Sequence, residues 1–363
     1  MTRLRVGVIG CGLIAQIAHL PYLHELAHLF EIHAISTTSP NRLEQVGQQY
    51  NVPKRFLDYR ELLEQDLDAV FVLTRDHAEI AMAVAERGKH VFVEKPIAFN
   101  LEEADAMITC ARKQGVKIMV GYMRRYDPGF QQAQSLFNEI KGDRLVRVHS
   151  SVGLPFRRVQ EMYDLIPGRE KAEKEIALSK GREERSLLQA IGQERSGLLR
   201  TYSLLLHLWS HNMNTLRGAF GDPQQINYAE VRLGKQKTSL PPSMQILAVM
   251  DYGPDLSCIW ESRAFMAHEA WDEELALSGS ERTVRVQFPF PYLKYTPATV
   301  TVEETINGNL IQQKMVTSYD EAFKRELKHF YDCIIKDVEP ITNGEDARKD
   351  LVWAIRLIRK VSI

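Results

Sequence analysis

A glycine-rich turn near the N-terminus has the spacing of a dinucleotide-binding loop. Gly10 and Gly12 end an apolar run, and Leu13, Ile14 and Ala15 open a helical pattern. Gly10 can make the tight turn, and Gly12 lets the backbone approach a pyrophosphate at the positive end of the helix. In this strand, turn and helix context the pattern indicates a nucleotide coenzyme, which we expect to contact Gly10, Gly12, Leu13 and Ile14.

The end of the next predicted strand bears on which coenzyme binds. In NAD-binding proteins an Asp or Glu there holds the ribose 2′-hydroxyl, whereas residues 34–42 of this chain contain no carboxylate. The hydroxyls of Ser36, Thr37 and Thr38 and the guanidinium of Arg42 could instead hold a 2′-phosphate. NADP is therefore the predicted coenzyme, and NAD is the alternative.

The first third of the chain alternates short apolar runs with helical patterns, which is typical of βαβ units around a parallel sheet. Asn100 and Gly115 are the expected N-cap and C-cap of a helix at 101–114. We therefore expect a doubly wound α/β domain over residues 1–122. Its predicted strands span 4–9, 31–36, 69–74, 90–94 and 117–121, and its other helices span 40–50 and 78–87.

From Met123 onward, period-2 alternation predicts an antiparallel sheet, so residues 123–363 are the expected second domain, of α+β class. Asn307-Gly308 marks a hairpin turn. Ser318-x-x-Glu321 has the form of a capping box that opens the first of two terminal helices. The other helices are expected at 128–139 and 345–360, and the strands at 144–152, 226–233, 244–252, 257–266, 273–277, 283–288 and 299–305.

Composition and charge exclude several classes of protein. With 363 residues, 44% hydrophobic and 26% charged, the chain is globular, and 46 Lys and Arg against 47 Asp and Glu give no basic field for nucleic acid or an anionic membrane. Four cysteines without C-x-x-C spacing, and no evident targeting or membrane segment, predict a cytoplasmic protein with a small, mildly polar ligand. The charge-dense segment 168–185 predicts a solvated helix with internal ion pairs, with a mobile lid or subunit contact as the alternative.

The tripeptide Glu94-Lys95-Pro96 follows a predicted strand and adds a second motif to the glycine-rich turn. With both motifs, the chain resembles the Gfo/Idh/MocA family, which includes glucose-fructose oxidoreductase and inositol dehydrogenase, over nearly its whole length. The resemblance implies a Rossmann domain that binds NAD or NADP. It also implies an open antiparallel sheet that covers coenzyme and substrate on one face and contacts another subunit on the other, in a homodimer or homotetramer. The matching positions are 10–15, 74, 77–81, 88–91, 94–96, 124–128 and the last two helices.

The resemblance assigns roles to individual residues. Lys95, next to Glu94 at the coenzyme, would stabilise a developing alkoxide on the substrate. His211 matches the catalytic histidine of a D-x-x-x-H signature, but His207 replaces the Asp and Asn214 replaces a second acid. On one helical face, His207 and His211 would titrate as a coupled pair and both would meet the substrate. The expected function is hydride transfer between nicotinamide and a sugar, polyol or keto-sugar.

The replaced acids leave two alternatives open. One is a non-redox enzyme of glycosidase or epimerase type, in which transient oxidation activates the substrate and the coenzyme is regenerated in each turnover. The other is a dinucleotide-sensing regulator with a protein partner. A zinc site at His207-x-x-x-His211 has no further ligands at a readable spacing, so no metal is predicted.

Other residues are expected at the border of the site. The loop with Thr74, Arg75 and His77 would lie on the nicotinamide side, although it is shorter than the common form in the family. Arg124 and Tyr126 follow the fifth predicted strand, and ligands bind outside the carboxyl ends of such strands. We expect Arg124 at both coenzyme and substrate, and Tyr126 at the substrate.

Overall fold

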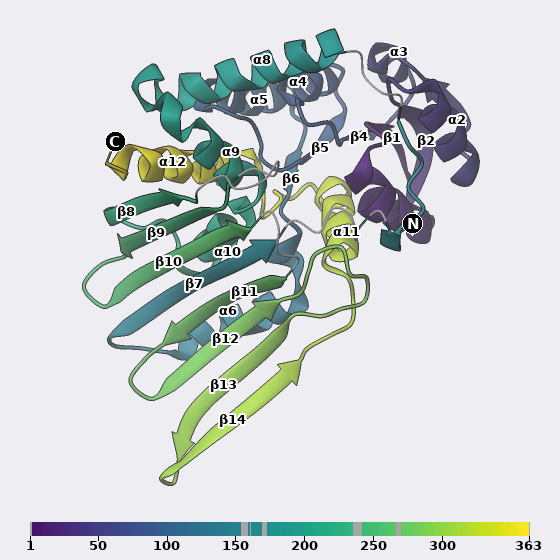
Figure 1. The fold of residues 1–363 in the computed structure, drawn as a ribbon. Coiled ribbons are helices and arrows are strands. Elements are labelled where there is room, and N and C mark those ends of the chain that lie inside the picture. Colours follow the sequence, from purple (N-terminus) through teal and green to yellow (C-terminus); the bar gives the residue numbers. More distant parts are fainter. Residues whose placement is uncertain are drawn as a thin grey trace. The chain divides into compact units, whose positions relative to one another are not determined.

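The computed structural model describes residues 2–153, 159, 161–168, 173–234, 242–265 and 270–362, without the side chains of 173–179 (Figure 1). The chain folds into two compact units. The first unit comprises residues 1–122, 160–199 and 323–352, and the second comprises 123–159, 200–322 and 353–363. The predicted change at residue 122 coincides with a boundary between units, but two later segments return to the first unit. Sequence patterns are local, so they did not indicate that return.

The first unit contains a parallel sheet of six strands in the order β3-β2-β1-β4-β5-β6. This order, with the first strand in the middle, is that of a doubly wound Rossmann sheet. The strands are β1 (Leu4–Ile9), β2 (Phe30–Ser36), β3 (Lys54–Phe56), β4 (Ala69–Val72), β5 (His90–Glu94) and β6 (Ile118–Gly121). The predicted α/β class is confirmed, and β3 is an additional edge strand.

One helix of the first unit has both of the caps that the sequence predicts. Helix α5 (Leu101–Gln114) begins after Asn100, whose side chain accepts the Glu103 N–H, and ends at Gly115 with a φ of 66°, so both predicted caps are confirmed. The other helices are η1 (Ala15–His19), α1 (Leu20–Glu25), α2 (Pro40–Gln49), α3 (Tyr59–Leu63), α4 (Ala78–Glu86), α8 (Glu173–Ile191), η3 (Gln193–Leu198) and α11 (Ala322–Ile335).

Helix α11 covers the middle of the parallel sheet. The ring of Phe330 lies 5.6 Å from the rings of Phe71 and Phe92, so this late helix completes the core of the first unit. The predicted capping box at its start is wrong. The helix begins at Ala322, and the Ser318 hydroxyl instead accepts the N–H of Asp320 in a local turn.

The second unit contains an eight-stranded sheet in the order β14-β13-β12-β11-β7-β10-β9-β8. The central pair β7 and β10 is parallel and the other pairs are antiparallel, so the purely antiparallel sheet that we predicted is corrected to a mixed one. Asn307 and Gly308 have positive φ angles, as a hairpin turn requires. The strands are β7 (Arg144–Gly153), β8 (Gln225–Leu233), β9 (Met244–Asp251), β10 (Leu256–Phe265), β11 (Trp271–Ser278), β12 (Arg282–Phe288), β13 (Thr299–Ile306) and β14 (Asn309–Val316).

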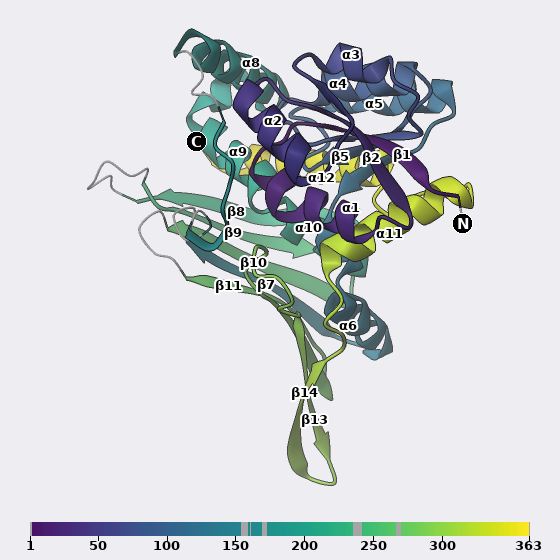
Figure 2. The same ribbon diagram turned by 90° about the vertical axis from the view of Figure 1, so that its right-hand side faces the viewer.

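One face of this sheet is covered and the other is open. Along β10, Cys258, Trp260, Ser262 and Ala264 are buried, whereas the residues between them are more exposed. Figure 2 shows the described helices of this unit on the same side of β8 to β11. The helices of this unit are η2 (Met123–Tyr126), α6 (Pro128–Glu139), α9 (Leu199–His207), α10 (Ser210–Phe220) and the end of α12 (Gly344–Lys360).

Some predictions fall on residues that are not described. They are Met266, at the end of a predicted strand, and residues 169–172 of the charge-dense segment. In the described ranges, no helix is long and apolar enough to cross a membrane.

Candidate active site

The glycine-rich turn presents bare backbone at the carboxyl end of β1. Gly10 has a φ of 96°, and its N–H donates to the Ser36 carbonyl at 2.8 Å. A Cβ at Gly10 would come within 3.0 Å of Leu73 and Thr74, whereas a Cβ at Gly12 would meet no atom within 4 Å. Gly10 is thus required by the packing, and Gly12 leaves a place for a ligand. This arrangement fits the pyrophosphate of a dinucleotide.

The hydroxyl residues after β2 differ in their surroundings. Ser36 is buried, and Thr37 donates its N–H to the Phe56 carbonyl of β3 at 3.2 Å. Thr38 is exposed. Of the three predicted ligand hydroxyls, those of Thr37 and Thr38 are therefore more accessible than that of Ser36.

Arg42 on α2 lies close to the glycine-rich turn. Burial raises the pKa of the Cys11 thiol to about 12, and the charge of Arg42 opposes this rise. Arg42 Nε donates to the Ile166 carbonyl at 3.2 Å. The guanidinium predicted to meet a 2′-phosphate is therefore held beside the turn that fits the pyrophosphate.

His77 links the loop after β4 to the turn after β5. Its Nδ1 lies 2.8 Å from the Thr74 carbonyl oxygen, and its Nε2 lies 2.7 Å from the Pro96 carbonyl oxygen. The His77 side chain is buried, so it acts as a fixed brace between the two segments. The structure thus brings the predicted residues Thr74 and His77 to the turn that contains Lys95.

The exposed part of the same loop contacts α8. Arg75 donates from Nε and Nη2 to the two carboxylate oxygens of Glu183, at 2.8 and 2.7 Å. Arg182 lies 3.3 Å from Asp76. Two charges of the segment 168–185 therefore pair with the Rossmann loop. The internal ion pairs predicted for this segment fall in part on side chains outside the described residues.

Glu94 and His19 form a buried pair beneath Lys95. Nε2 of His19 lies 2.7 Å from Oε1 of Glu94, and Oε2 of Glu94 accepts the Lys95 N–H at 3.1 Å. His19 is fully buried and Lys95 is half-buried. Glu94 therefore supports the turn from inside the protein.

Glu326 on α11 is a second buried carboxyl in this region. Neither of its oxygens has a hydrogen-bond partner in the described part of the chain. Burial, with a smaller contribution from the charge of Glu94, raises the pKa of Glu326 well above its ordinary value. Burial thus favours the protonated, uncharged form of Glu326 over a second negative charge beside Glu94.

The two predicted catalytic histidines do not share a continuous helix. Helix α9 ends at His207 and α10 begins at Ser210, so Leu208 and Trp209 lie between the two helices, and Trp209 is the N-cap of α10. The prediction that His207 and His211 occupy one face of one helix is therefore wrong, because the chain leaves helical geometry between them. Asn214, at the position of the family's second acid, accepts a hydrogen bond from Arg125 at 3.3 Å.

Arg124 and Tyr126, predicted at the edge of the site, are both buried in the second unit. Nη1 of Arg124 donates to Oε1 of Glu273 at 2.8 Å, and Nη2 pairs with the other oxygen. The Arg124 guanidinium also lies over the ring of Phe288, 4.7 Å from its centre. The structure thus places the Arg124 charge in a bidentate ion pair of the sheet.

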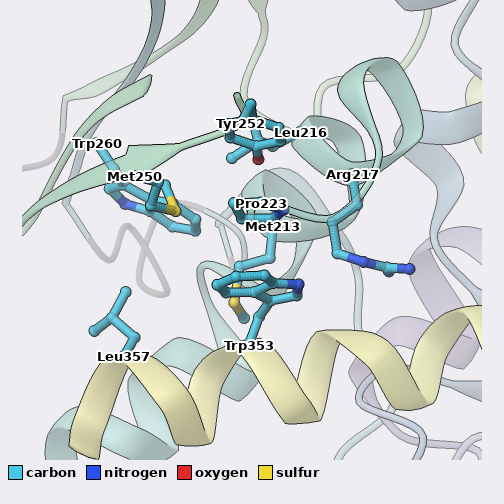
Figure 3. A pocket seen from close by; sticks show the side chains of 9 residues that line it. All are labelled: Met213, Leu216, Arg217, Pro223, Met250, Tyr252, Trp260, Trp353 and Leu357. Atoms are coloured by element: carbon cyan, nitrogen blue, oxygen red, sulfur yellow. The ribbon is translucent and has the colours of Figure 1, made fainter. Parts of the chain in front are cut away.

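A cavity in the second unit is too small for a substrate. Its lining is mostly apolar, its volume is ≈ 10 Å³, and it has room for about one water molecule (Figure 3). The hydroxyl of Tyr252, one of its lining residues, has no hydrogen-bond partner among the described residues. This cavity is therefore not a sugar site.

Comparison with known proteins finds a family match for the first third of the chain. Residues 4–122 match the family GFO_IDH_MocA, described as an oxidoreductase family with an NAD-binding Rossmann fold. The Rossmann segment belongs to the Gfo/Idh/MocA family. This finding confirms the resemblance and the prediction of an NAD(P)-binding Rossmann fold.

Individual relatives agree with that assignment. Over 40% of its length, this chain is similar to an uncharacterized oxidoreductase, YrbE, of Bacillus subtilis, with 34% identity over 43% of the relative. It is also similar to a myo-inositol 2-dehydrogenase of Thermotoga maritima (37% identity over 36% and 39%). The chain therefore aligns with less than half the length of these curated relatives.

A solved structure shares the fold over the full length. KijD10, a 3-ketoreductase of Actinomadura kijaniata solved with NADP, superposes with a TM-score of 0.73 at 19% identity. The match covers 99% of this chain and 98% of that chain. This likeness shows that both units have the fold of that protein.

Sequence reasoning missed four polar residues around the predicted site. Gln16 and His19 lie only a few residues after the glycine-rich turn, and their polar character within a buried helix could have drawn attention to them. Glu273 shares the buried face of β11 with Leu275, and Glu326 is buried on α11 with Phe323 and Phe330, so a charge at a core position was the available signal.

Proposed function

We propose that the protein is an NAD(P)-dependent oxidoreductase that transfers a hydride between nicotinamide C4 and a carbon of a sugar, polyol or keto-sugar. One observation carries the proposal: bare backbone at Gly12 and the braced Lys95 turn follow strands of the same parallel sheet, at their carboxyl ends. Ligands of such sheets bind at this edge. The myo-inositol 2-dehydrogenase and the 3-ketoreductase described above support a carbohydrate-like substrate.

The coenzyme supplies the hydride acceptor or donor when it is bound. The backbone of Gly10, Gly12, Leu13 and Ile14 would hold its pyrophosphate at the start of a helix. Arg42 would hold a 2′-phosphate, because no carboxylate stands after β2 to repel it. These features favour NADP over NAD.

Two side chains would act on the substrate. Lys95 would hold the oxygen of the reacting carbon and stabilise the negative charge that develops there. His211 would remove the hydroxyl proton during oxidation, or return it during reduction. His207, at the end of the preceding helix, is proposed as a second substrate contact. The loop of Thr74 and His77 would border the nicotinamide.

The Lys95→Ala variant tests the central role of the ammonium group. Coenzyme binding is expected to stay within about twofold of wild type, while hydride transfer to or from polyols and keto-sugars falls about 100-fold or more. Lys113→Ala, which removes an exposed lysine of the same unit, is the control. An undiminished rate in Lys95→Ala would contradict the mechanism.

We also propose that the open sheet face joins two copies of the chain into a homodimer, alone or within a homotetramer. Three adjacent strands expose apolar side chains there: Leu145 (42% exposed), Ile259 (40%) and Val249 (36%). Ile259 and Val249 are directly opposite each other in the β9–β10 pair. Sedimentation velocity should show a dimer or tetramer, and Ile259→Glu should shift it toward monomer.

A further inference from the structure

A segment far along the chain lies against the glycine-rich turn. The Ile166 N–H donates to Oε1 of Gln16 at 2.8 Å, and the Ile166 carbonyl accepts from Nε2 of Gln16 at 3.2 Å. The same Nε2 donates to the Cys11 carbonyl at 2.9 Å. One amide side chain therefore joins the Cys11 carbonyl, inside the turn, to the backbone of Ile166, which lies 150 residues after Gln16.

This segment also fixes Arg42. The Ile166 carbonyl accepts from Arg42 Nε at 3.2 Å, and the guanidinium packs against Gly168. A Cβ at Gly168 would lie 2.6 to 2.7 Å from Nη2, Cζ and Nη1 of Arg42, so only glycine leaves room for this position. The hydrogen bond uses Nε alone. Within the described ranges, the two terminal nitrogens of Arg42 make no hydrogen bond, and both remain to bind an anion.

We propose that Gln16, the backbone of Ile166 and Gly168 determine coenzyme choice by holding the Arg42 guanidinium ready for the 2′-phosphate of NADP(H). This inference rests on the proposed coenzyme-binding function and deepens it. An arginine anchored before binding loses less side-chain freedom when the phosphate arrives. The two terminal nitrogens can then form charge-assisted hydrogen bonds to phosphate oxygens. NADH lacks the 2′-phosphate, so holding Arg42 in this position should not strengthen NADH binding.

The test is a fluorescence titration of purified full-length protein with NADPH and with NADH. The variants are Gly168→Ala, which displaces the guanidinium, and Gln16→Ala, which releases Ile166. The control is Gly197→Ala, because a Cβ there meets no atom within 4 Å. We expect each of the two variants to weaken NADPH binding about tenfold and NADH binding less than about twofold. The control should change neither.

The variant Arg42→Ala separates the inference from the proposed function. If Arg42→Ala loses the preference for NADPH but Gly168→Ala and Gln16→Ala keep it, the proposed role of Gln16 and Gly168 is wrong, and the role of Arg42 stands. If both variants weaken NADPH and NADH equally, the segment supports the whole coenzyme site and the specificity assignment is overturned. If wild type binds neither coenzyme, the proposed function itself fails, and this inference with it.

Discussion

Nε2 of His19 lies 2.7 Å from Oε1 of Glu94, with the imidazole fully buried. His19 belongs to the helix that follows the glycine-rich turn, and Glu94 accepts the N–H of Lys95 through its other oxygen. The pair therefore joins the turn that fits a pyrophosphate to the turn that presents the proposed catalytic lysine. A shift in one turn is resisted by the other.

Replacing His19 should destabilise the protein. In His19→Phe the Glu94 carboxylate keeps its buried position but loses the ring nitrogen, and a hydrogen bond to a charged group contributes about 1.5 to 3 kcal/mol. We expect the free energy of unfolding in urea to fall by about that amount. His28→Phe replaces an exposed histidine and serves as the control. Equal stability of His19→Phe and wild type would show that the pair contributes nothing.

Glu326 should make stability depend on pH. Its pKa is raised in the folded protein, so its contribution is fully present below the ordinary carboxyl pKa of 4.5 and is lost as pH rises toward the folded pKa. Glu326→Gln has no proton to lose. Its free energy of unfolding relative to wild type should therefore increase with pH, by at most about 1.4 kcal/mol per pH unit.

Urea unfolding from about pH 5 to about pH 8 measures this difference. The buried amide adds an offset that is constant with pH, so only the slope is diagnostic. Glu86→Gln, at an exposed position on α4, should give no slope relative to wild type. A flat difference for Glu326→Gln would mean that the carboxyl is solvated or paired.

Arg124 and Glu273 should behave as a buried ion pair. Arg124→Leu leaves the Glu273 charge buried without its partner, which costs about 3 to 5 kcal/mol of unfolding free energy. The double variant Arg124→Leu, Glu273→Leu should recover a large part of that loss in urea unfolding. If the double variant is stable and binds NADPH like wild type, Arg124 does not contact the coenzyme. Weaker NADPH binding by the stable double variant would favour the contact predicted from the sequence.

His207 and His211 should differ in their effect on rate. Loss of a general acid or base costs about 100-fold or more, so we expect a decrease of that size in kcat for His211→Ala. His207→Ala should raise KM and leave the pH profile of kcat unchanged, because in this proposal His207 contacts the substrate and transfers no proton. A shifted kcat profile in His207→Ala would show that the rings are coupled after all.

The sequence predicted the regular elements well where local signals are strong. Asn100, Gly115 and the apolar stripe between them located α5, and a helix predicted at 128–139 coincides with α6. It missed β3, which has three residues, and β14, whose side chains are exposed on both faces and show no alternation. The parallel pairing of β7 with β10 depends on topology, which no local pattern encodes.

The candidate site was also predictable only where local sequence signals identify its residues. Gly10, Gly12 and Lys95 lie in short motifs, so their types and spacing identify them. The bond between Gln16 and Ile166 joins residues 150 positions apart, and no spacing rule reaches that far. The break at Trp209 was also missed, because an apolar residue in a helical pattern gives no stop signal.

The central claim is that a nicotinamide coenzyme binds at the glycine-rich turn. The most direct measurement is nicotinamide fluorescence during titration of wild type and Gly12→Ala with NADPH and NADH. The added methyl group meets no protein atom within 4 Å, so the variant should fold normally, yet it blocks the close approach of a pyrophosphate. We predict saturable binding to wild type, tighter for NADPH, and a loss of about 100-fold or more in Gly12→Ala. Absence of saturable binding to wild type, or equal binding to the variant, would contradict the account.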